Sequence, residues 1–138
     1  MSELLEKARS YEAKKIAATD KESKPLFHIS APAGWINDPN GFSVYNGKIH
    51  LFYQYYPYLR EWGPMHWGHS TTSDMIKWEQ LPCVLAPDEE YDKKGCFSGS
   101  AIEADGKHVL VYTGVTSIKL PDGSEQERQN QCIAFGDG

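Results

Sequence analysis

The sequence is poor in cysteine and has no long hydrophobic run, and each absence excludes a class of protein. Its 138 residues contain three cysteines, Cys83, Cys96 and Cys132, and no CxxC pair. This number and spacing predict neither a disulfide framework nor a zinc site, and reduced thiols are typical of the cytoplasm. No apolar stretch approaches the ~18 residues that a membrane span requires. The N-terminus also lacks the apolar core of a signal peptide, so we expect a cytoplasmic protein without a membrane partner.

Positive charge is scarce as well. The chain has 14 Lys and Arg against 19 Asp and Glu, a formal net charge of -5, and no basic run, which argues against a nucleic-acid partner. The GxSxG and GxxxxGK motifs are absent, so no serine nucleophile and no phosphate-binding loop are predicted, and we expect no cofactor. The composition is 40% hydrophobic with many tyrosines and tryptophans, which predicts a folded protein with a hydrophobic core.

The first residues differ in pattern from the rest of the chain. Apolar residues recur at helical spacing without Gly or Pro, which predicts a helix over residues 3 to 18. A polar linker follows the helix, and Pro25 marks the change of pattern. We therefore divide the chain into a helix with its linker, residues 1–24, and a β domain, residues 25–138.

Turn signals divide the β domain into short strands. They are Asn46-Gly47, Ser73-Asp74, Asp105-Gly106 and Asp122-Gly123. The Asn-Gly and first Asp-Gly pairs favour the type I′ turn of a β-hairpin. Many short antiparallel strands without βαβ alternation predict an all-β sandwich, barrel or propeller. The two hairpins are separated by about one propeller blade or slightly more, which favours a propeller.

The segment WINDPNG, residues 35–41, admits two interpretations. Asp-Pro-Asn-Gly fits a tight turn, with Pro in the second position and Gly in the fourth. Asp38 is, however, embedded among aromatic residues, where a carboxylate can be held to react. The residues alone leave both interpretations open for Asp38.

Other polar and aromatic positions also have two interpretations. Gln54 ends an apolar strand, so it is either a solvated strand end or an amide that holds a substrate hydroxyl. Trp62 lies in a loop and is either part of the core or a surface on which a sugar stacks. The small residues after Phe97, beginning at Ser98, indicate either a close strand crossing or a close approach of a ligand.

Three further features have a favoured structural interpretation. His66 and His69 are three residues apart on an expected strand, which places their rings on opposite faces, so no metal site is predicted. The acidic residues between Glu89 and Asp92 are interpreted as a solvated loop. Arg60 is interpreted as a solvated loop residue, with a phosphate contact as the alternative.

Five segments, in this order, resemble glycoside hydrolase family 32, the β-fructosidases, which include invertases, sucrose-6-phosphate hydrolases, levanases and inulinases. The segments are WINDPNG, LFYQYYPY, WGPMHWGHSTTSDMIKWE, LAPDEEYDKKGCFSGSA and VYTG. The family usually has Met where this chain has Ile36, which is a mild apolar change. The resemblance implies a five-bladed β-propeller, of which these residues form about the first two blades after a short helix.

The resemblance also implies the roles of individual residues. Asp38 matches the nucleophile of a retaining mechanism, which forms a covalent fructosyl-enzyme that water then hydrolyses. Asn37 matches a residue that binds a fructose hydroxyl. The other positions that match the fructose subsite are Gln54, Trp62, Phe97 and Ser98. The implied substrate is sucrose or a related β-fructoside, such as sucrose-6-phosphate.

A retaining glycosidase also needs a general acid, with its carboxyl group ~5–5.5 Å from the nucleophile. In the family this acid is a Glu followed by Cys, and a transition-state-stabilising Asp lies in an Arg-Asp-Pro motif. The sequence contains neither motif. We therefore expect an N-terminal part of the enzyme, truncated before the acid and inactive by itself. The alternatives are a fructosyltransferase of the same family and a non-catalytic propeller that binds a partner, and the oligomeric state is not predicted.

Overall fold

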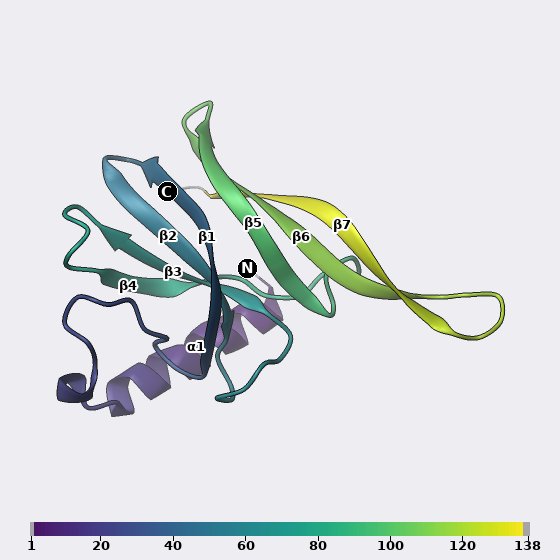
Figure 1. Cartoon of the computed structure of the whole chain (residues 1–138), viewed down its shortest axis with the longest axis horizontal. Coiled ribbons are helices and arrows are strands. Elements are labelled where there is room, and N and C mark those ends of the chain that lie inside the picture. The colour runs from purple at the N-terminus through teal and green to yellow at the C-terminus, as the bar shows by residue number, and fades with distance from the viewer. Residues whose placement is uncertain (1, 137–138) are drawn as a thin grey trace.

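The structure, a computed structural model, describes residues 2–136 as a helix followed by two antiparallel β-sheets (Figure 1). The sheets have the strand orders β1-β2-β3-β4 and β5-β6-β7. The elements are α1 (Glu3–Ala18), η1 (Lys21–Ser23), β1 (Trp35–Tyr45), β2 (Lys48–Tyr56), β3 (His66–Thr72), β4 (Glu79–Leu85), β5 (Gly95–Ala104), β6 (Lys107–Lys119) and β7 (Glu125–Gly136). The first strands of the two sheets, β1 and β5, lie side by side. The predicted all-β architecture after a short helix is confirmed.

The helix α1 begins with a cap that its sequence supplies. The Ser2 hydroxyl accepts a hydrogen bond from the backbone N–H of Leu5 at 3.1 Å. Glu3 in the first turn and Lys15 in the last turn complement the helix dipole. The helix predicted over residues 3 to 18 is therefore confirmed, while the domain boundary after residue 24 stays a prediction. Within residues 2–136, no helix has the length and apolar character needed to cross a membrane.

The helix covers the outer edge of the first sheet, at strand β4. Glu12 Oε2 accepts a hydrogen bond from the backbone N–H of Cys83 at 3.1 Å. Arg9 Nε donates to the carbonyl oxygen of the same Cys83 at 2.7 Å. Because Glu12 and Ala8 are buried in this contact, the helix is fixed against the sheet by both polar and apolar groups.

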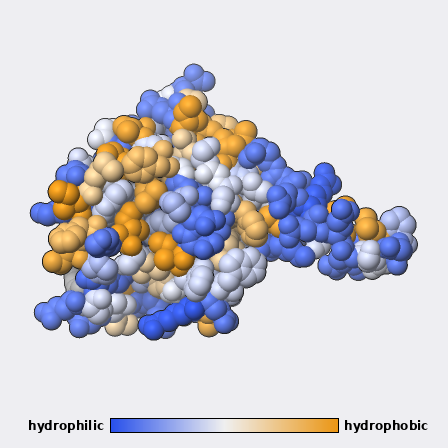
Figure 2. All heavy atoms as spheres, viewed as in Figure 1, coloured by the Kyte–Doolittle hydropathy of each residue, from blue (hydrophilic) through white to orange (hydrophobic). Residues whose placement is uncertain are grey.

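The hairpin turns have the conformation that their sequences favour. Asn46 and Gly47 have φ of 48° and 72°, and the pair Asp105 and Gly106 has φ of 51° and 72°. A positive φ at both residues is the requirement of a type I′ turn. The β6–β7 hairpin extends from the body as a twisted, hydrophilic arm (Figures 1 and 2). After the turn signal at Ser73-Asp74, the strand β4 begins at Glu79.

The strand β2 supplies residues to two hydrophobic cores, one on each face. Phe52 packs between the two sheets with Trp67, Cys96, Leu110, Tyr112 and Cys132. Tyr53 and Tyr55 point to the opposite face and pack under α1 with Ala8 and Cys83. This division follows from strand geometry, because successive side chains of a strand point to opposite faces.

The WINDPNG segment is not the tight turn that its composition favours. It lies within β1, where the pairing with β2 shifts between Ile36 and Pro39. At this β-bulge Asn37 and Asp38 together face the single residue Gln54. The turn prediction was wrong because β1 is an edge strand of its sheet with a bulge, and both features accommodate a proline that cannot donate a hydrogen bond.

Candidate active site

The structure brings three of the predicted site residues into one chain of hydrogen bonds. The Ser98 hydroxyl donates to Asp38 Oδ2 at 3.2 Å. The same hydroxyl oxygen accepts a hydrogen bond from Gln54 Nε2 at 3.0 Å. A hydroxyl has one hydrogen, so the amide of Gln54 directs that hydrogen towards Asp38 by occupying a lone pair. Asp38 Oδ1 is left as the second oxygen of an exposed carboxylate.

Two β-bulges place these side chains in contact. Asp38 lies in the bulge of β1 opposite Gln54. Ser98 lies in a second bulge, in β5, where the pairing with β6 shifts between Phe97 and Gly99. A bulge re-aims the side chain of the extra residue, which a regular strand would direct by strict alternation. The site therefore depends on two local irregularities in two different sheets.

Two aromatic rings meet at Phe97, the residue before Ser98. The Trp62 and Phe97 rings meet edge to face, with centroids 6.3 Å apart and an interplanar angle of 89°. Trp62 is 57% exposed, so its face is open to a ligand. Trp67 is fully buried and belongs to the core, and its Nε1 donates to the carbonyl oxygen of Phe97 at 3.2 Å. This bond fixes the backbone of Phe97, the residue directly before Ser98.

A buried carboxylate supports the start of β5, and here the sequence interpretation was wrong. Asp92 was expected in a solvated loop, yet it is 1% exposed. Its Oδ2 accepts a hydrogen bond from the Tyr112 hydroxyl at 2.8 Å, and its Oδ1 accepts one from the backbone N–H of Glu89 at 2.9 Å. Burial raises the pKa of the Asp92 carboxyl above its ordinary value. The turn before Phe97 is thereby tied to strand β6.

Sequence reasoning missed Asn40, the second asparagine of WINDPNG. This residue is 4% exposed, and its Oδ1 accepts a hydrogen bond from the backbone N–H of Gly99 at 3.2 Å. The bond joins β1 to β5 directly beside the contact of Asp38 with Ser98. The sequence signal for this role was a polar residue, Asn40, next to the candidate nucleophile, but the composition of Asp-Pro-Asn-Gly had favoured a turn at that position.

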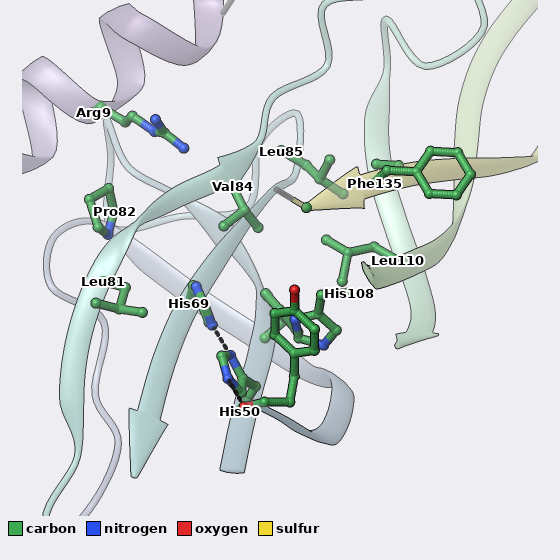
Figure 3. A pocket seen from close by; sticks show the side chains of 14 residues that line it. Arg9, His50, His69, Leu81, Pro82, Val84, Leu85, His108, Leu110 and Phe135 are labelled. Atoms are coloured by element: carbon green, nitrogen blue, oxygen red, sulfur yellow. Dashed lines mark hydrogen bonds between the residues drawn. The ribbon is translucent and has the colours of Figure 1, made fainter. Parts of the chain in front are cut away.

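A cavity of about 380 Å³ lies elsewhere, between the two sheets, and is lined by three histidines (Figure 3). His50 Nδ1 and His69 Nε2 are 2.9 Å apart, and His108 stands at an angle to His50 with ring centroids separated by 4.8 Å. Burial lowers the pKa of all three and brings that of His69 to about 3. Apolar side chains such as Phe52 and Leu110 form much of the wall. The histidine side chains that line this cavity are therefore neutral, and we interpret the cavity as a packing feature between the two sheets.

Comparison with known proteins identifies the family. Residues 28–138 match the domain described as "Glycosyl hydrolases family 32 N-terminal domain". The chain belongs to glycosyl hydrolase family 32. A sucrose-6-phosphate hydrolase of Escherichia coli is 49% identical over 110 residues, which are 80% of this chain and 23% of that protein. The chain thus spans about a quarter of the length of this relative.

Solved structures of family 32 have the same fold over these residues. A β-fructofuranosidase of Bombyx mori matches with a TM-score of 0.81 and 45% identity, covering 96% of this chain and 27% of that chain. A mutant of the same enzyme in complex with sucrose matches with a TM-score of 0.81 and 44% identity, over 96% of this chain and 27% of that chain. The predicted resemblance to family 32 and its N-terminal propeller fold is therefore confirmed.

The remaining residues of the family 32 prediction have different positions. Asn37 is exposed beside Asp38 in the bulge. Arg60 is exposed and lines a separate hollow of about 360 Å³ with Lys15 and Lys24. No three His, Cys, Asp or Glu side chains of residues 2–136 gather in a way that could hold a metal ion. The roles assigned to Asp38, Asn37 and the subsite residues stay predictions.

Proposed function

We propose that these residues carry the nucleophile of a retaining glycoside hydrolase that cleaves terminal β-fructofuranosides such as sucrose or sucrose-6-phosphate. The observation that carries the proposal is the hydrogen-bonded chain from Gln54 through Ser98 to the exposed Asp38 carboxylate. Membership of family 32 and a related structure in complex with sucrose support a sugar substrate. The partner is then a small sugar, and the three free, buried thiols support a cytoplasmic location.

In the proposed reaction Asp38 Oδ1 attacks the anomeric carbon of the fructosyl unit, and the bond to the leaving sugar oxygen breaks. Ser98 holds Oδ2, so the carboxylate keeps one orientation during the attack. The leaving oxygen takes a proton from a general acid, and water then releases fructose from Asp38 with net retention. Trp62 and Phe97 would stack on the sugar, and the exposed Asn37 amide would hold one of its hydroxyls.

We propose that the general acid comes from residues outside these 138, because the chain covers 23% of its sucrose-6-phosphate hydrolase relative. Without that acid the 138-residue chain by itself would not catalyse turnover of the substrate. Loss of leaving-group protonation costs roughly 10²–10⁴-fold in rate. Fructose release from sucrose by the isolated chain at near the rate of the complete enzyme would contradict this part of the proposal.

The nucleophile is tested with Asp38→Asn in the complete polypeptide that carries these residues. We expect turnover of sucrose to be lost, because an amide is a poor nucleophile at the anomeric carbon. Proton NMR of the first fructose released by the wild type should show the anomeric configuration of the substrate. Substantial activity of Asp38→Asn, or inversion in the wild type, would refute the assignment.

The same assay separates a hydrolase from a fructosyltransferase. At high sucrose concentration a hydrolase releases fructose and glucose in equal amounts. A transferase passes the fructosyl unit to another sugar, so free fructose falls below glucose and oligosaccharides accumulate. We expect equal release, and a large excess of glucose would favour the transferase.

A further inference from the structure

The side chain of Asn40 joins two sheets that have separate backbone ladders. Its Oδ1 accepts the Gly99 N–H at 3.2 Å, while β1 and β5 belong to separate sheets. We propose that Asn40 is a positioning residue that holds β1 and β5 in the register in which Ser98 reaches Asp38. The catalytic part of this inference rests on the proposed function of Asp38.

Asn40 and its partner Gly99 lie close in the chain to Asp38 and Ser98, the two residues of the other cross-sheet contact. It follows Asp38 by two residues along β1, and Gly99 directly follows Ser98 along β5. The two cross-sheet hydrogen bonds, Asn40 to Gly99 and Ser98 to Asp38, are therefore neighbours. When one of them is removed, the other loses the constraint on its geometry.

The strands β1 and β5 approach closely beside Asn40. A Cβ atom added at Gly41 would lie 2.7 Å from Phe52 Cδ2, 3.0 Å from the Cβ of Ala101 and 3.5 Å from the backbone nitrogen of Ala101. The residue after Asn40 therefore has little room for a side chain on the side that faces β5. The buried side chain of Asn40 lies in this narrow contact and links the two strands.

Asn40 keeps its polar side chain at a cost in stability. Its Nδ2 is buried and has no hydrogen-bond partner among the described residues. An unpaired buried donor lowers stability, and an apolar residue of the same size would avoid that cost. A neutral amide can accept from Gly99 without placing a second negative charge beside Asp38, which an aspartate would do. The amide is therefore suited to position the carboxylate without opposing it.

The contact itself is tested by exchange of the Gly99 amide hydrogen, measured by NMR or mass spectrometry. Asn40→Leu should raise the exchange rate at Gly99 at least tenfold, and Asn40→Asp, which keeps an acceptor, should retain most of the protection. Ser43→Ala is the matched control, because Ser43 also bonds across the sheets, to His108 Nε2 at 2.9 Å, but lies away from Asp38. Unchanged exchange at Gly99 in Asn40→Leu would overturn the proposal.

The catalytic consequence is tested in the complete enzyme with Asn40→Leu, Ser98→Ala and the double variant. Asn40→Leu should lower kcat about 10–100-fold with KM changed less than about threefold, because geometry in the transition state is lost. In the double variant Asn40→Leu should add little to Ser98→Ala, whereas Ser43→Ala should leave kcat unchanged.

Failure of this inference is distinct from failure of the proposed function. Fully additive losses, or an unchanged kcat in Asn40→Leu, would reduce Asn40 to a structural residue. If the wild type releases no fructose from any fructoside, the proposed function fails. A crystal structure of Asn40→Leu then decides the inference: a retained Ser98–Asp38 contact overturns it, and a lost contact supports it. Asn40→Ser gives the same readout if the leucine variant does not fold.

Discussion

Acidification should destabilise this chain through buried histidines. His69 is 9% exposed, stacks on Phe52 with a centroid separation of 4.3 Å, and has its pKa lowered by burial to about 3 (Figure 3). His66 is 4% exposed, and burial lowers its pKa to about 4. Both remain neutral in the folded chain, while in the unfolded chain they take up protons near the ordinary value of 6.5.

The magnitude follows from the linkage of protonation and folding. As the pH falls below 6.5, the unfolded state binds protons that the folded histidines do not, so the free energy of unfolding decreases until the folded pKa values are reached. Each unit of pH in this window costs about 1.4 kcal/mol per histidine. Between pH 7 and pH 5 each histidine therefore costs about 2 kcal/mol, out of a typical stability of roughly 5–15 kcal/mol.

Buried carboxyls act in the opposite direction. Burial raises the pKa of Glu12 and of Asp92 above 4.5 and 3.8, respectively. As the pH falls, the folded chain therefore takes up these protons before the unfolded chain does. The free energy of unfolding consequently increases as the pH falls through the folded pKa values of these two carboxyls. The histidine contribution must be isolated by mutation for this reason.

The assay is urea unfolding of wild type and His69→Gln at pH 7 and pH 5, followed by circular dichroism. His69→Gln should lower stability at pH 7, yet its loss between pH 7 and pH 5 should be smaller than that of the wild type by about 2 kcal/mol. His28→Gln is the control, because His28 is exposed. Equal pH dependence in His69→Gln and wild type would refute the reasoning.

Two further predictions concern the site. Trp62→Ala should raise KM for sucrose about tenfold with little change in kcat, because stacking on an exposed ring contributes to binding in ground and transition states alike. Steady-state kinetics of the complete enzyme measures both constants, and a loss confined to kcat would contradict the prediction. Gly99→Ala should lower the free energy of unfolding by about 1–3 kcal/mol, because its Cβ would lie 2.0 Å from the Val111 carbonyl oxygen. Ser100→Ala, at an exposed neighbouring position, should change stability by less than about 0.5 kcal/mol in the same urea titration.

The fold was predictable where local patterns decide the structure. The alternation along β2 separates the Phe52 core from the core of Tyr53 and Tyr55, as expected for a strand buried on both faces. The Asn46-Gly47 turn has the left-handed conformation that its residues favour. In these regions chemistry within a few residues determines the outcome.

The site was less predictable because it depends on bulges and distant partners. The strands β1 and β5 belong to separate sheets and each contains a bulge, so the sequence does not indicate which residues of β5 meet Asp38 and Asn40. Asp92 is buried because the Tyr112 hydroxyl, twenty residues along the chain, meets its carboxylate. The motifs identify the family and the candidate residues, but the contacts that hold them come from other strands.

The contact of α1 with Cys83 has a consequence for association between molecules. β4 is the last strand of its sheet, and such an edge offers free backbone groups to a strand of another chain. Glu12 and Arg9 occupy the donor and the acceptor of Cys83, at the middle of that strand. The helix thus acts as a barrier to intermolecular β-sheet growth, so this face of the protein is shielded from aggregation by two charged side chains.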